Sequence, residues 1–383
     1  MNRDFSVLFL LTAHDDISKN GGGEIRTDYV IKQAQAGSNN GSVSVFKPSL
    51  FFNSKVIKEH FGIVKLVIPF VYFLAALKNI TVRDKRIDLI YCGTCYPNDS
   101  LGAIMLKFIF GIPTACVSHD TPAQLVGYKF YRNSEKLGIL KSVVMTVLGR
   151  IEELFIRAID FPISISSFGK DYLEKIVKGK VLLDSSNGVR EVCSTTDLTL
   201  EARIYDIVYV GRIIPRKNIH MLLDAIDRLD SDGVRLNMLV ITNTPDAEMQ
   251  DIFKFMTHHS TNTRFTLAKN VSEEEKFKLL RKAKISVNVS YDENFSISVL
   301  ESASCGNALI LTDILSFKNI YGKSAYYVEM NDVISLADTI KTLLGEPQKL
   351  TECMKSAREV ASKYNYQSIW NRELTYFSEL LHK

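Results

Sequence analysis

Short apolar runs alternate with helix-length segments along nearly the whole chain, and this alternation limits the possible folds more than any other feature. Several runs, most clearly residues 7–11, lack the polar alternation of a strand that has one face in water. Strands that are apolar on both sides are typical of parallel sheets with helices on both faces. The sequence therefore predicts an α/β protein with doubly wound sheets.

The series of strands and helices occurs twice, on either side of a polar linker at residues 194–197. The predicted strands before the linker are residues 7–11, 43–46, 87–92, 114–118, 162–166 and 180–184. The predicted strands after it are residues 206–210, 237–242, 264–269, 285–289, 308–312 and 326–329. Two such series predict two doubly wound α/β domains, residues 1–197 and 198–364, which bind ligands beyond the carboxyl ends of their strands.

The composition is that of an ordinary globular protein, with 383 residues of which 46% are hydrophobic and 23% charged. A formal net charge of +4 gives no basic footprint of the kind that nucleic-acid-binding proteins carry. The longest apolar run, residues 67–77, is about half as long as a membrane-spanning helix and contains Pro69. We therefore expect a soluble protein that at most lies on a membrane surface and has no nucleic acid among its partners.

The six cysteines are scattered, which is too sparse for a disulfide framework and favours a reducing, cytoplasmic compartment. Cys92 and Cys95 form a lone C-x-x-C, so a structural zinc site is not expected. Asp230 and Asp232 have the spacing of a metal-binding D-x-D, but they follow a predicted helix at a turn away from the expected ligand edge. The sequence thus predicts no bound metal and no cofactor.

A glycine loop, Gly21 to Gly23, follows the first predicted strand and opens a helix. Without side chains, the backbone N–H groups of Gly22 and Gly23 can approach an anion at the helix N-terminus. The spacing matches neither the dinucleotide-binding fingerprint nor the P-loop. The alternative is a flexible connection between strand and helix.

A basic segment lies at the start of the second series, where Arg212 closes a strand and Lys217 opens the next helix. The two cations can converge on one anion with the helix N-terminus behind them, and a diphosphate suits such a site. The alternative is a solvated basic turn, which is the expectation for Arg216.

Two carboxylates, Glu293 and Glu301, lie eight positions apart after the predicted strand 285–289. Glu293 is in a loop and Glu301 is in an apolar, small-residue segment that is typical of a helix. Carboxylates at this edge of a sheet can hold the hydroxyls of a sugar. The backbone amides of Asn294, Phe295 and Ser296 are expected to face the same ligand, with the Phe295 ring in the core or pocket wall. The alternative is two surface carboxylates.

His119 ends the predicted strand 114–118, and this places it at the edge where ligands bind. A single histidine is otherwise more often structural.

Together these residues resemble the GT-B glycosyltransferases, and within them the large retaining family 4. The matching residues are Gly21–Gly23, His119, Ser167, Gly169–Asp171, Asn187–Val189, Gly211, Arg212, Lys217, Asn218, Glu293–Glu301 and Gly306. They follow the family order from residue 6 to about residue 315. The resemblance implies two Rossmann-like domains that face each other across a deep cleft, with residues 365–383 crossing back to the first domain.

The resemblance also implies roles for these residues. Arg212 and Lys217 would hold the donor diphosphate and offset the charge of the leaving group. Glu293 and the amides of residues 294–296 would contact the donor sugar, and Glu301 the ribose. Gly22 or Gly23 would approach the donor phosphate and His119 the transferred sugar.

The sequence thus predicts a retaining glycosyltransferase that uses a UDP- or GDP-sugar, no metal, and a glycan or lipid-linked acceptor. Attack by the acceptor on the front face of the donor sugar is expected, since no nucleophile for a double displacement is visible. The alternatives are a nucleotide-sugar epimerase, another GT-B enzyme such as a phosphorylase, or a non-catalytic subunit that binds nucleotide sugars or glycans.

Residues 128–159 carry six Lys or Arg and three Glu, which accounts for most of the net charge of +4. Apolar residues recur there at helical spacing. The positions are 140, 143, 144, 147, 148, 151, 154, 155 and 158. One interpretation is an amphipathic helix that lies on an anionic membrane as a peripheral protein does. The other is a normal helix that buries its apolar face against the sheet.

Overall fold

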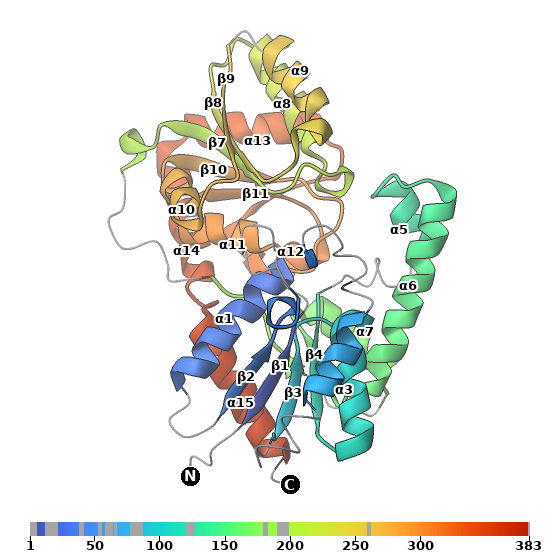
Figure 1. The fold of residues 1–383 in the computed structure, drawn as a ribbon. Coiled ribbons are helices and arrows are strands. Elements are labelled where there is room, and N and C mark those ends of the chain that lie inside the picture. The colour runs from blue at the N-terminus through green and yellow to red at the C-terminus, as the bar shows by residue number, and fades with distance from the viewer. Residues whose placement is uncertain are drawn as a thin grey trace. The chain divides into compact units, whose positions relative to one another are not determined.

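The chain forms two compact units, each built on a parallel sheet with flanking helices (Figure 1). The computed structural model describes residues 6–11, 22–37, 42–52, 56–57, 64, 67–76, 87–119, 127–178, 183–189, 199–258 and 262–381. The first unit comprises Met1–Tyr131, Gly138–Asn187 and Tyr366–Lys383, and the second comprises Arg132–Leu137 and Gly188–Asn365. The predicted α/β class with two doubly wound sheets is confirmed.

In the first unit, the described strands form a sheet of order β2-β1-β3-β4-β5-β6 in which all pairs are parallel. Its strands are β1 (Val7–Leu10), β2 (Val43–Phe46), β3 (Leu89–Cys92), β4 (Thr114–Ser118), β5 (Phe161–Ser164) and β6 (Leu183–Asp184). Its helices are α1 (Gly22–Gly37), α3 (Pro97–Phe110), α5 (Tyr128–Asn133), α6 (Ile139–Ala158), α7 (Ser167–Ile176) and α15 (Tyr366–Leu381). α5 ends in the short segment that groups with the second unit.

Two predicted elements of this unit differ from the structure. The predicted strand 180–184 is described only as β6, because residues 180–182 lie outside the described part. The segment 128–159, with its helical spacing, is divided into α5 and α6, and Gly138 takes an extended conformation just before α6. β1, β3 and β4 are buried along their whole length, as strands covered on both faces should be.

In the second unit, the described strands form a parallel sheet of order β12-β11-β10-β7-β8-β9. Its strands are β7 (Tyr205–Val210), β8 (Asn237–Thr242), β9 (Arg264–Lys269), β10 (Ala283–Asn288), β11 (Ala308–Thr312) and β12 (Tyr326–Val328). Its helices are α8 (Ile219–Ser231), α9 (Gln250–His258), α10 (Glu273–Arg281), α11 (Ile297–Ser304), α12 (Leu315–Tyr321), α13 (Val333–Gly345) and α14 (Pro347–Ala361).

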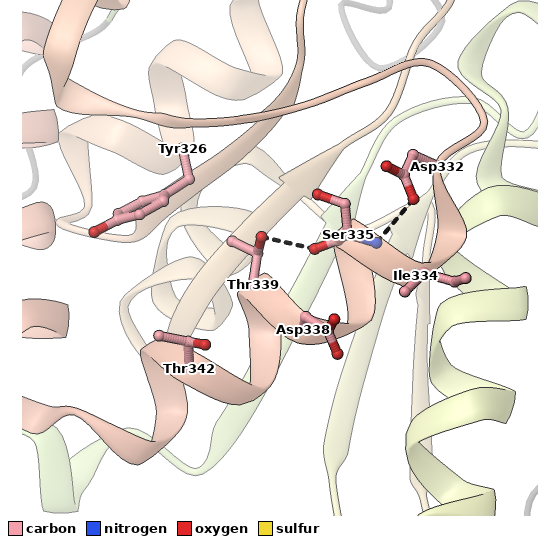
Figure 2. A pocket seen from close by; sticks show the side chains of 7 residues that line it. All are labelled: Tyr326, Asp332, Ile334, Ser335, Asp338, Thr339 and Thr342. Carbon is pink, nitrogen blue, oxygen red and sulfur yellow. Dashed lines mark hydrogen bonds between the residues drawn. The ribbon is translucent and has the colours of Figure 1, made fainter.

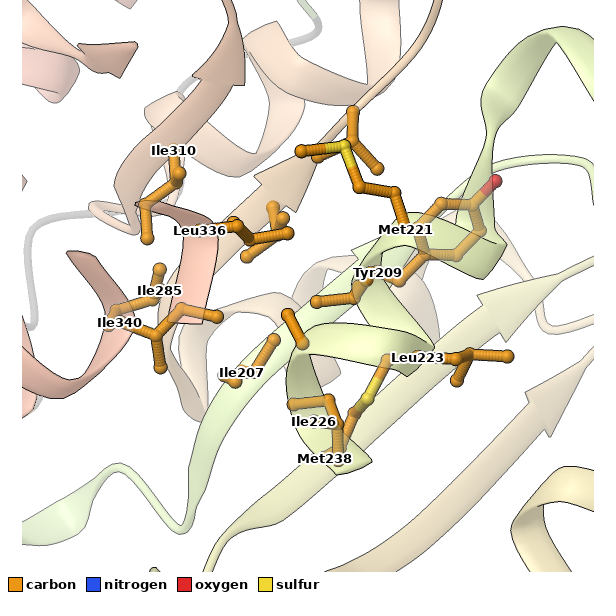
Figure 3. Close-up of a cluster of buried hydrophobic side chains, with 14 of the residues drawn as sticks. Ile207, Tyr209, Met221, Leu223, Ile226, Met238, Ile285, Ile310, Leu336 and Ile340 are labelled. Carbon is orange, nitrogen blue, oxygen red and sulfur yellow. The ribbon is translucent and has the colours of Figure 1, made fainter. Parts of the chain in front are cut away.

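The main core of the second unit lies between its sheet and the helices α8 and α13 (Figure 3). Ile207, Ile285 and Ile310 from three adjacent strands meet Leu336 and Ile340 of α13 there, all of them fully buried. Helix α8 adds its own apolar face to the same core. This packing fixes the strand ends from which the polar loops leave the sheet.

Each sheet has one place where the order of strands reverses, and such switch points are where open α/β sheets bind ligands. In the second unit the reversal lies between β7 and β10, which pair directly. In the first unit it lies between β1 and β3. The loops that follow these strands carry most of the predicted site residues.

Candidate active site

The switch point of the second unit is flanked by the loop after β7 and the loop after β10. The loop after β7 ends in a 3-10 turn, Pro215–Lys217, and Asn218 then takes a left-handed conformation before α8 begins. The two loops are tied together because the Tyr291 N–H donates to the Arg216 carbonyl at 2.9 Å. This bond holds the basic and acidic segments at one edge of the sheet.

Lys217 and Glu293 meet at this edge, 76 residues apart in sequence. The Lys217 ammonium donates to Glu293 Oε1 and forms an ion pair with it. Only 13% of the Lys217 side chain and 9% of the Glu293 side chain are exposed. Ser290 Oγ donates to the same carboxylate oxygen at 3.0 Å. The structure thus brings together two of the residues that the sequence assigns to the diphosphate and the sugar.

The Glu293 carboxylate is kept ionised by its neighbours. Burial by itself would raise its pKa, but the positive charges of Lys217 and Arg216, with hydrogen bonds from Lys217 and Ser290, hold the pKa below its ordinary value. Burial, together with the nearby Glu293 charge, raises the pKa of Tyr209, so that phenol stays protonated. Its O–H donates to the Arg212 carbonyl at 2.9 Å and fixes the start of the basic loop.

Asn294, Phe295 and Ser296 connect this carboxylate to helix α11, and all of them are buried. The Phe295 ring meets Tyr364 edge-on at 5.4 Å between ring centres, so it belongs to the wall of the site. Ser296 precedes the first residue of α11 and makes no side-chain cap. The first N–H groups of α11 therefore point toward the loop, where a helix N-terminus favours an anion.

Glu301 lies in α11 and is buried, but its partner is a residue that the sequence analysis missed. Lys276 in α10 donates to Glu301 Oε1 at 2.6 Å. Burial raises the pKa of Glu301, and the Lys276 ammonium opposes that shift without cancelling it. The two glutamates thus have separate cations, and this excludes the alternative of two surface carboxylates.

The remaining arginines of the basic loop differ in their surroundings. Arg212 is exposed and, within the described part of the chain, forms no ion pair. Arg216 was expected to be solvated, and that expectation is wrong. Its guanidinium lies 3.1 Å from Glu135 with only 15% of the side chain exposed. No spacing in the sequence could link these residues, since Glu135 belongs to a separate short segment.

In the first unit, Gly22 and Gly23 open helix α1 as predicted, whereas Gly21 lies outside the described residues. A β-carbon at Gly23 would come within 2.8 Å of the His119 ring, so only glycine fits there. His119 Nε2 lies 3.1 Å from the Gly93 carbonyl, which leaves the sheet after β3. Gly23, Gly93 and His119 thus meet at the switch point of this sheet.

The His119 ring is neutral at physiological pH. Burial and the nearby Arg26 charge lower its pKa to about 3, although the Gly93 carbonyl opposes the shift. A neutral ring whose Nε2–H donates to Gly93 can form hydrogen bonds but contributes no charge.

Other sequence signals have structural explanations. A disulfide joins Cys95, just after β3, to Cys116 in the neighbouring strand β4, so the expectation of reduced cysteines is wrong for this pair. Asp230 is buried and accepts the Asn262 N–H at 3.0 Å. Among the described residues, no cluster of three or more His, Cys, Asp or Glu side chains could hold a metal ion.

An open pocket of about 540 Å³ lies in the second unit beside β12 and α13 (Figure 2). Asp332 caps α13 there by accepting the Ser335 N–H at 2.9 Å, and Thr339 bonds back to the Ser335 carbonyl. None of the predicted site residues lines this pocket. Three of its polar residues, Asp332, Ser335 and Thr339, bond within the helix itself.

Comparison with known proteins agrees with this geometry. Residues 199–360, which contain Arg212, Lys217, Glu293 and Glu301, match the family of glycosyl transferases group 1. An uncharacterised glycosyltransferase of Methanocaldococcus jannaschii is 22% identical over 293 residues, which is 76% of this chain and 74% of that protein. The capsular polysaccharide biosynthesis glycosyltransferase CapM of Staphylococcus aureus is 25% identical over 200 residues, about half of each protein.

Solved structures match over the full length. Sucrose-phosphate synthase from Thermosynechococcus elongatus aligns with a TM-score of 0.73 at 15% identity and covers 99% of both chains. HepE of Anabaena, in complex with UDP-glucose, aligns with a TM-score of 0.66 at 15% identity and covers 98% of this chain and 99% of its own. Residues 199–360 thus carry the match to the glycosyl transferases group 1, and the chain as a whole has the GT-B fold of these solved structures.

Proposed function

We propose that this glycosyltransferase takes a sugar from a nucleotide-sugar donor and transfers it, with retention and without a metal ion, to a glycan or lipid-linked acceptor. The observation that carries the proposal is the Lys217–Glu293 pair at the switch point of the second sheet. A cation and an ionised carboxylate at one strand edge match the two ends of a sugar diphosphate. UDP and GDP are the nucleotides that we expect the donor to contain.

The positive charge around this edge supplies what a metal ion otherwise would. Lys217, Arg212 and the N-terminus of α11 offset the charge that grows on the diphosphate as the sugar leaves. Because Arg212 is exposed, its guanidinium can reach a phosphate without first breaking an ion pair. HepE was solved with UDP-glucose, and this supports a nucleotide-sugar donor here.

The proposed step exchanges one bond for another at the anomeric carbon of the sugar. Its bond to the donor phosphate oxygen breaks, and a bond to the acceptor hydroxyl oxygen forms on the same face. The proton of that hydroxyl passes to the departing diphosphate, so charge and atoms balance. Glu293 holds hydroxyls of the transferred sugar, and Glu301 holds the ribose.

The first unit contributes neutral groups in this proposal. His119 offers hydrogen bonds to the transferred sugar, and the backbone of Gly22 and Gly23 approaches phosphate. A charged imidazole would add to the positive potential, whereas the depressed pKa of His119 keeps it uncharged.

The test uses two lysines of the same sheet. Lys217→Ala should lower kcat/KM by about 100-fold or more, because it removes a cation aimed at developing charge. Lys284→Ala is the matched control. Lys284 of β10 pairs with Asp206 of β7 at 2.8 Å, near the starts of the two strands whose other ends lead to Lys217 and Glu293. Full transfer by Lys217→Ala would refute the proposal, and equal losses in both variants would point to a fold defect. Activity should also persist in excess EDTA.

A further inference from the structure

Helix α6 exposes an apolar stripe that an ordinary surface helix would bury against its sheet. Leu140, Val144, Val147 and Leu154 are exposed and, with half-buried Ile151, form one stripe at spacings of three and four residues. Leu140 is 78% exposed. The interpretation that this helix buries its apolar face against the sheet is therefore wrong.

The inward side of α6 is small and polar along most of its length, and its last turn adds Ile156 to the apolar core. Ser142, Gly149, Glu152 and Glu153 are buried there. The Tyr172 hydroxyl of α7 donates to Glu153 Oε1 at 2.6 Å, and Ser142 Oγ bonds the Gly138 carbonyl at 2.9 Å. The helix is thus held to its unit through polar groups along most of its length and through apolar packing at its last turn. Its apolar stripe stays exposed and is available to a binding partner.

Exposed apolar residues also lie at the end of α3. Lys107 in α3 donates to the Ala158 carbonyl at the end of α6 at 2.7 Å, so the two helix ends adjoin. Phe108 and Ile109 beside it are exposed, Phe108 by 77%. We name the exposed residues Phe108, Ile109, Ile139, Leu140, Val143, Val144, Val147, Leu148 and Leu154 the outer patch. Exposed apolar side chains that gather along one helix face in this way mark an interaction site.

Cations flank the stripe on both sides. At 3.6 residues per turn, Lys141 lies on one side of it and Arg150 and Arg157 lie on the other. Arg150 also bonds Glu153, whose carboxylate is turned inward. The two acidic residues of α6, Glu152 and Glu153, are both buried. The outward face of the helix therefore carries only positive charge.

We infer that the outer patch docks on the surface of an anionic lipid bilayer. An apolar stripe bordered by cations fits the boundary between acyl chains and anionic headgroups, with α6 lying in the plane of the membrane. A second copy of the chain is a poorer occupant, because a symmetric pairing would bring these cations against one another. Among the described residues, no helix is both long and apolar enough to cross a membrane.

Flotation with lipid vesicles tests the inference without substrates. The wild-type protein should float with vesicles of mixed phosphatidylcholine and phosphatidylglycerol, and only weakly with pure phosphatidylcholine. The double variant Leu140→Glu/Val147→Glu should bind at least about tenfold less, because two apolar anchors are lost and two repelling charges are added. Lys141→Glu should weaken binding to the anionic vesicles alone, by about fivefold or more.

The matched control changes two exposed apolar residues of the second unit. Leu315 and Ile334 are each 56% exposed, and both lie in the first turn of a helix where glutamate is tolerated. Leu315→Glu/Ile334→Glu should float like the wild type. Thermal unfolding and transfer to a water-soluble acceptor should be unchanged in all variants, and this separates docking from the proposed catalysis.

Three results would overturn the inference. The wild type could fail to bind either kind of vesicle, or the outer-patch variant could bind as tightly as the wild type. Light scattering could also show a dimer that Leu140→Glu/Val147→Glu converts to a monomer while vesicle binding is absent. That outcome would assign the patch to a second copy of the chain.

Discussion

At the scale of single residues, Glu293 and Glu301 have opposite electrostatic surroundings although both are buried. Cations and hydrogen bonds keep the pKa of Glu293 low, whereas burial raises that of Glu301 despite Lys276. Replacing either glutamate leaves a nearly buried lysine, Lys217 or Lys276, without its counter-charge, but only at Glu301 does burial outweigh the attraction of the cation. The two carboxylates should therefore respond differently to the same substitution.

We predict a division between kcat and KM. Glu293→Gln should lower kcat by about 100-fold, since its carboxylate is proposed to hold the sugar that moves. Glu301→Gln should raise the KM for the donor by about tenfold with little change in kcat, because ribose binding is the same in ground and transition states. Steady-state kinetics on both variants provide the measurement. A loss of kcat in Glu301→Gln alone would reverse the roles assigned here.

His119 gives a prediction about stability and pH. Its pKa is 6.5 when unperturbed and about 3 in the fold, so the unfolded chain binds the proton first on acidification. The stability that neutral His119 contributes is present above pH 6.5 and is lost as the pH falls from there toward 3. His119→Gln should therefore lose about 2 kcal/mol less than the wild type between pH 7 and pH 5.

The chain's single tryptophan makes this measurable. Trp370 is buried in α15 of the first unit, the unit that contains His119. Urea unfolding followed by tryptophan fluorescence at the two pH values reports on that unit. Equal pH dependence in both proteins would show that His119 titrates normally.

At the scale of elements, helices α1 and α15 are locked by a buried charge pair. Arg26 of α1 and Glu373 of α15 are both fully buried and form an ion pair. Tyr91 of β3 accepts from Arg26 at 2.9 Å and donates to Glu373 at 3.1 Å, and Ser185 joins the network. Tyr29 and Tyr366 stack beside it with ring centres 4.7 Å apart. The last helix thus fixes the helix that begins with the glycine loop.

Breaking this pair should be costly. Glu373→Ala leaves a buried guanidinium without its counter-charge and should destabilise the first unit by about 3–5 kcal/mol. Glu379→Ala is the control, because Glu379 is exposed on the same helix. Arg26→Met/Glu373→Leu should recover much of the loss, since no charge is then buried. Tryptophan fluorescence in urea gives all the values, and a neutral Glu373→Ala would contradict this account.

The elements differ in how far the sequence predicts them. The strands were predictable because burial on both faces requires apolar runs, as in β1 and β11. The orientation of α6 was not, because helical periodicity identifies an apolar face and not the direction in which it points. The sequence analysis missed three further pairings for another reason: those of Lys276, of Glu373 and of Cys95 with Cys116. Their partners are distant in sequence, and only the packed fold brings them together.

At the scale of the whole chain, the strand order explains why the residues of the candidate site could be predicted from sequence motifs. Lys217 and Glu293 follow β7 and β10, and Gly23 and His119 follow β1 and β4, all at or beside a reversal of strand order. Ligand-binding loops are confined to such edges, so a polar motif after a predicted strand is informative. The chain passes from one unit to the other after Asn187 and again after Asn365, the second time next to residue 364, where the sequence analysis ends the second domain.

The same architecture predicts how the protein responds to donor nucleotides. A ligand that binds only the folded protein stabilises it by mass action, by about 2.7 kcal/mol at 100 times its Kd. UDP or GDP should therefore raise the melting temperature by several degrees, whereas the nucleoside monophosphates should do less because one phosphate is missing. Lys217→Ala should abolish the shift, and Lys284→Ala should leave it intact. EDTA should change neither result, because Lys217 and Arg212 are proposed to supply the positive charge. A shift that survives in Lys217→Ala, or that requires a divalent cation, would place the diphosphate elsewhere than at the Lys217–Glu293 edge.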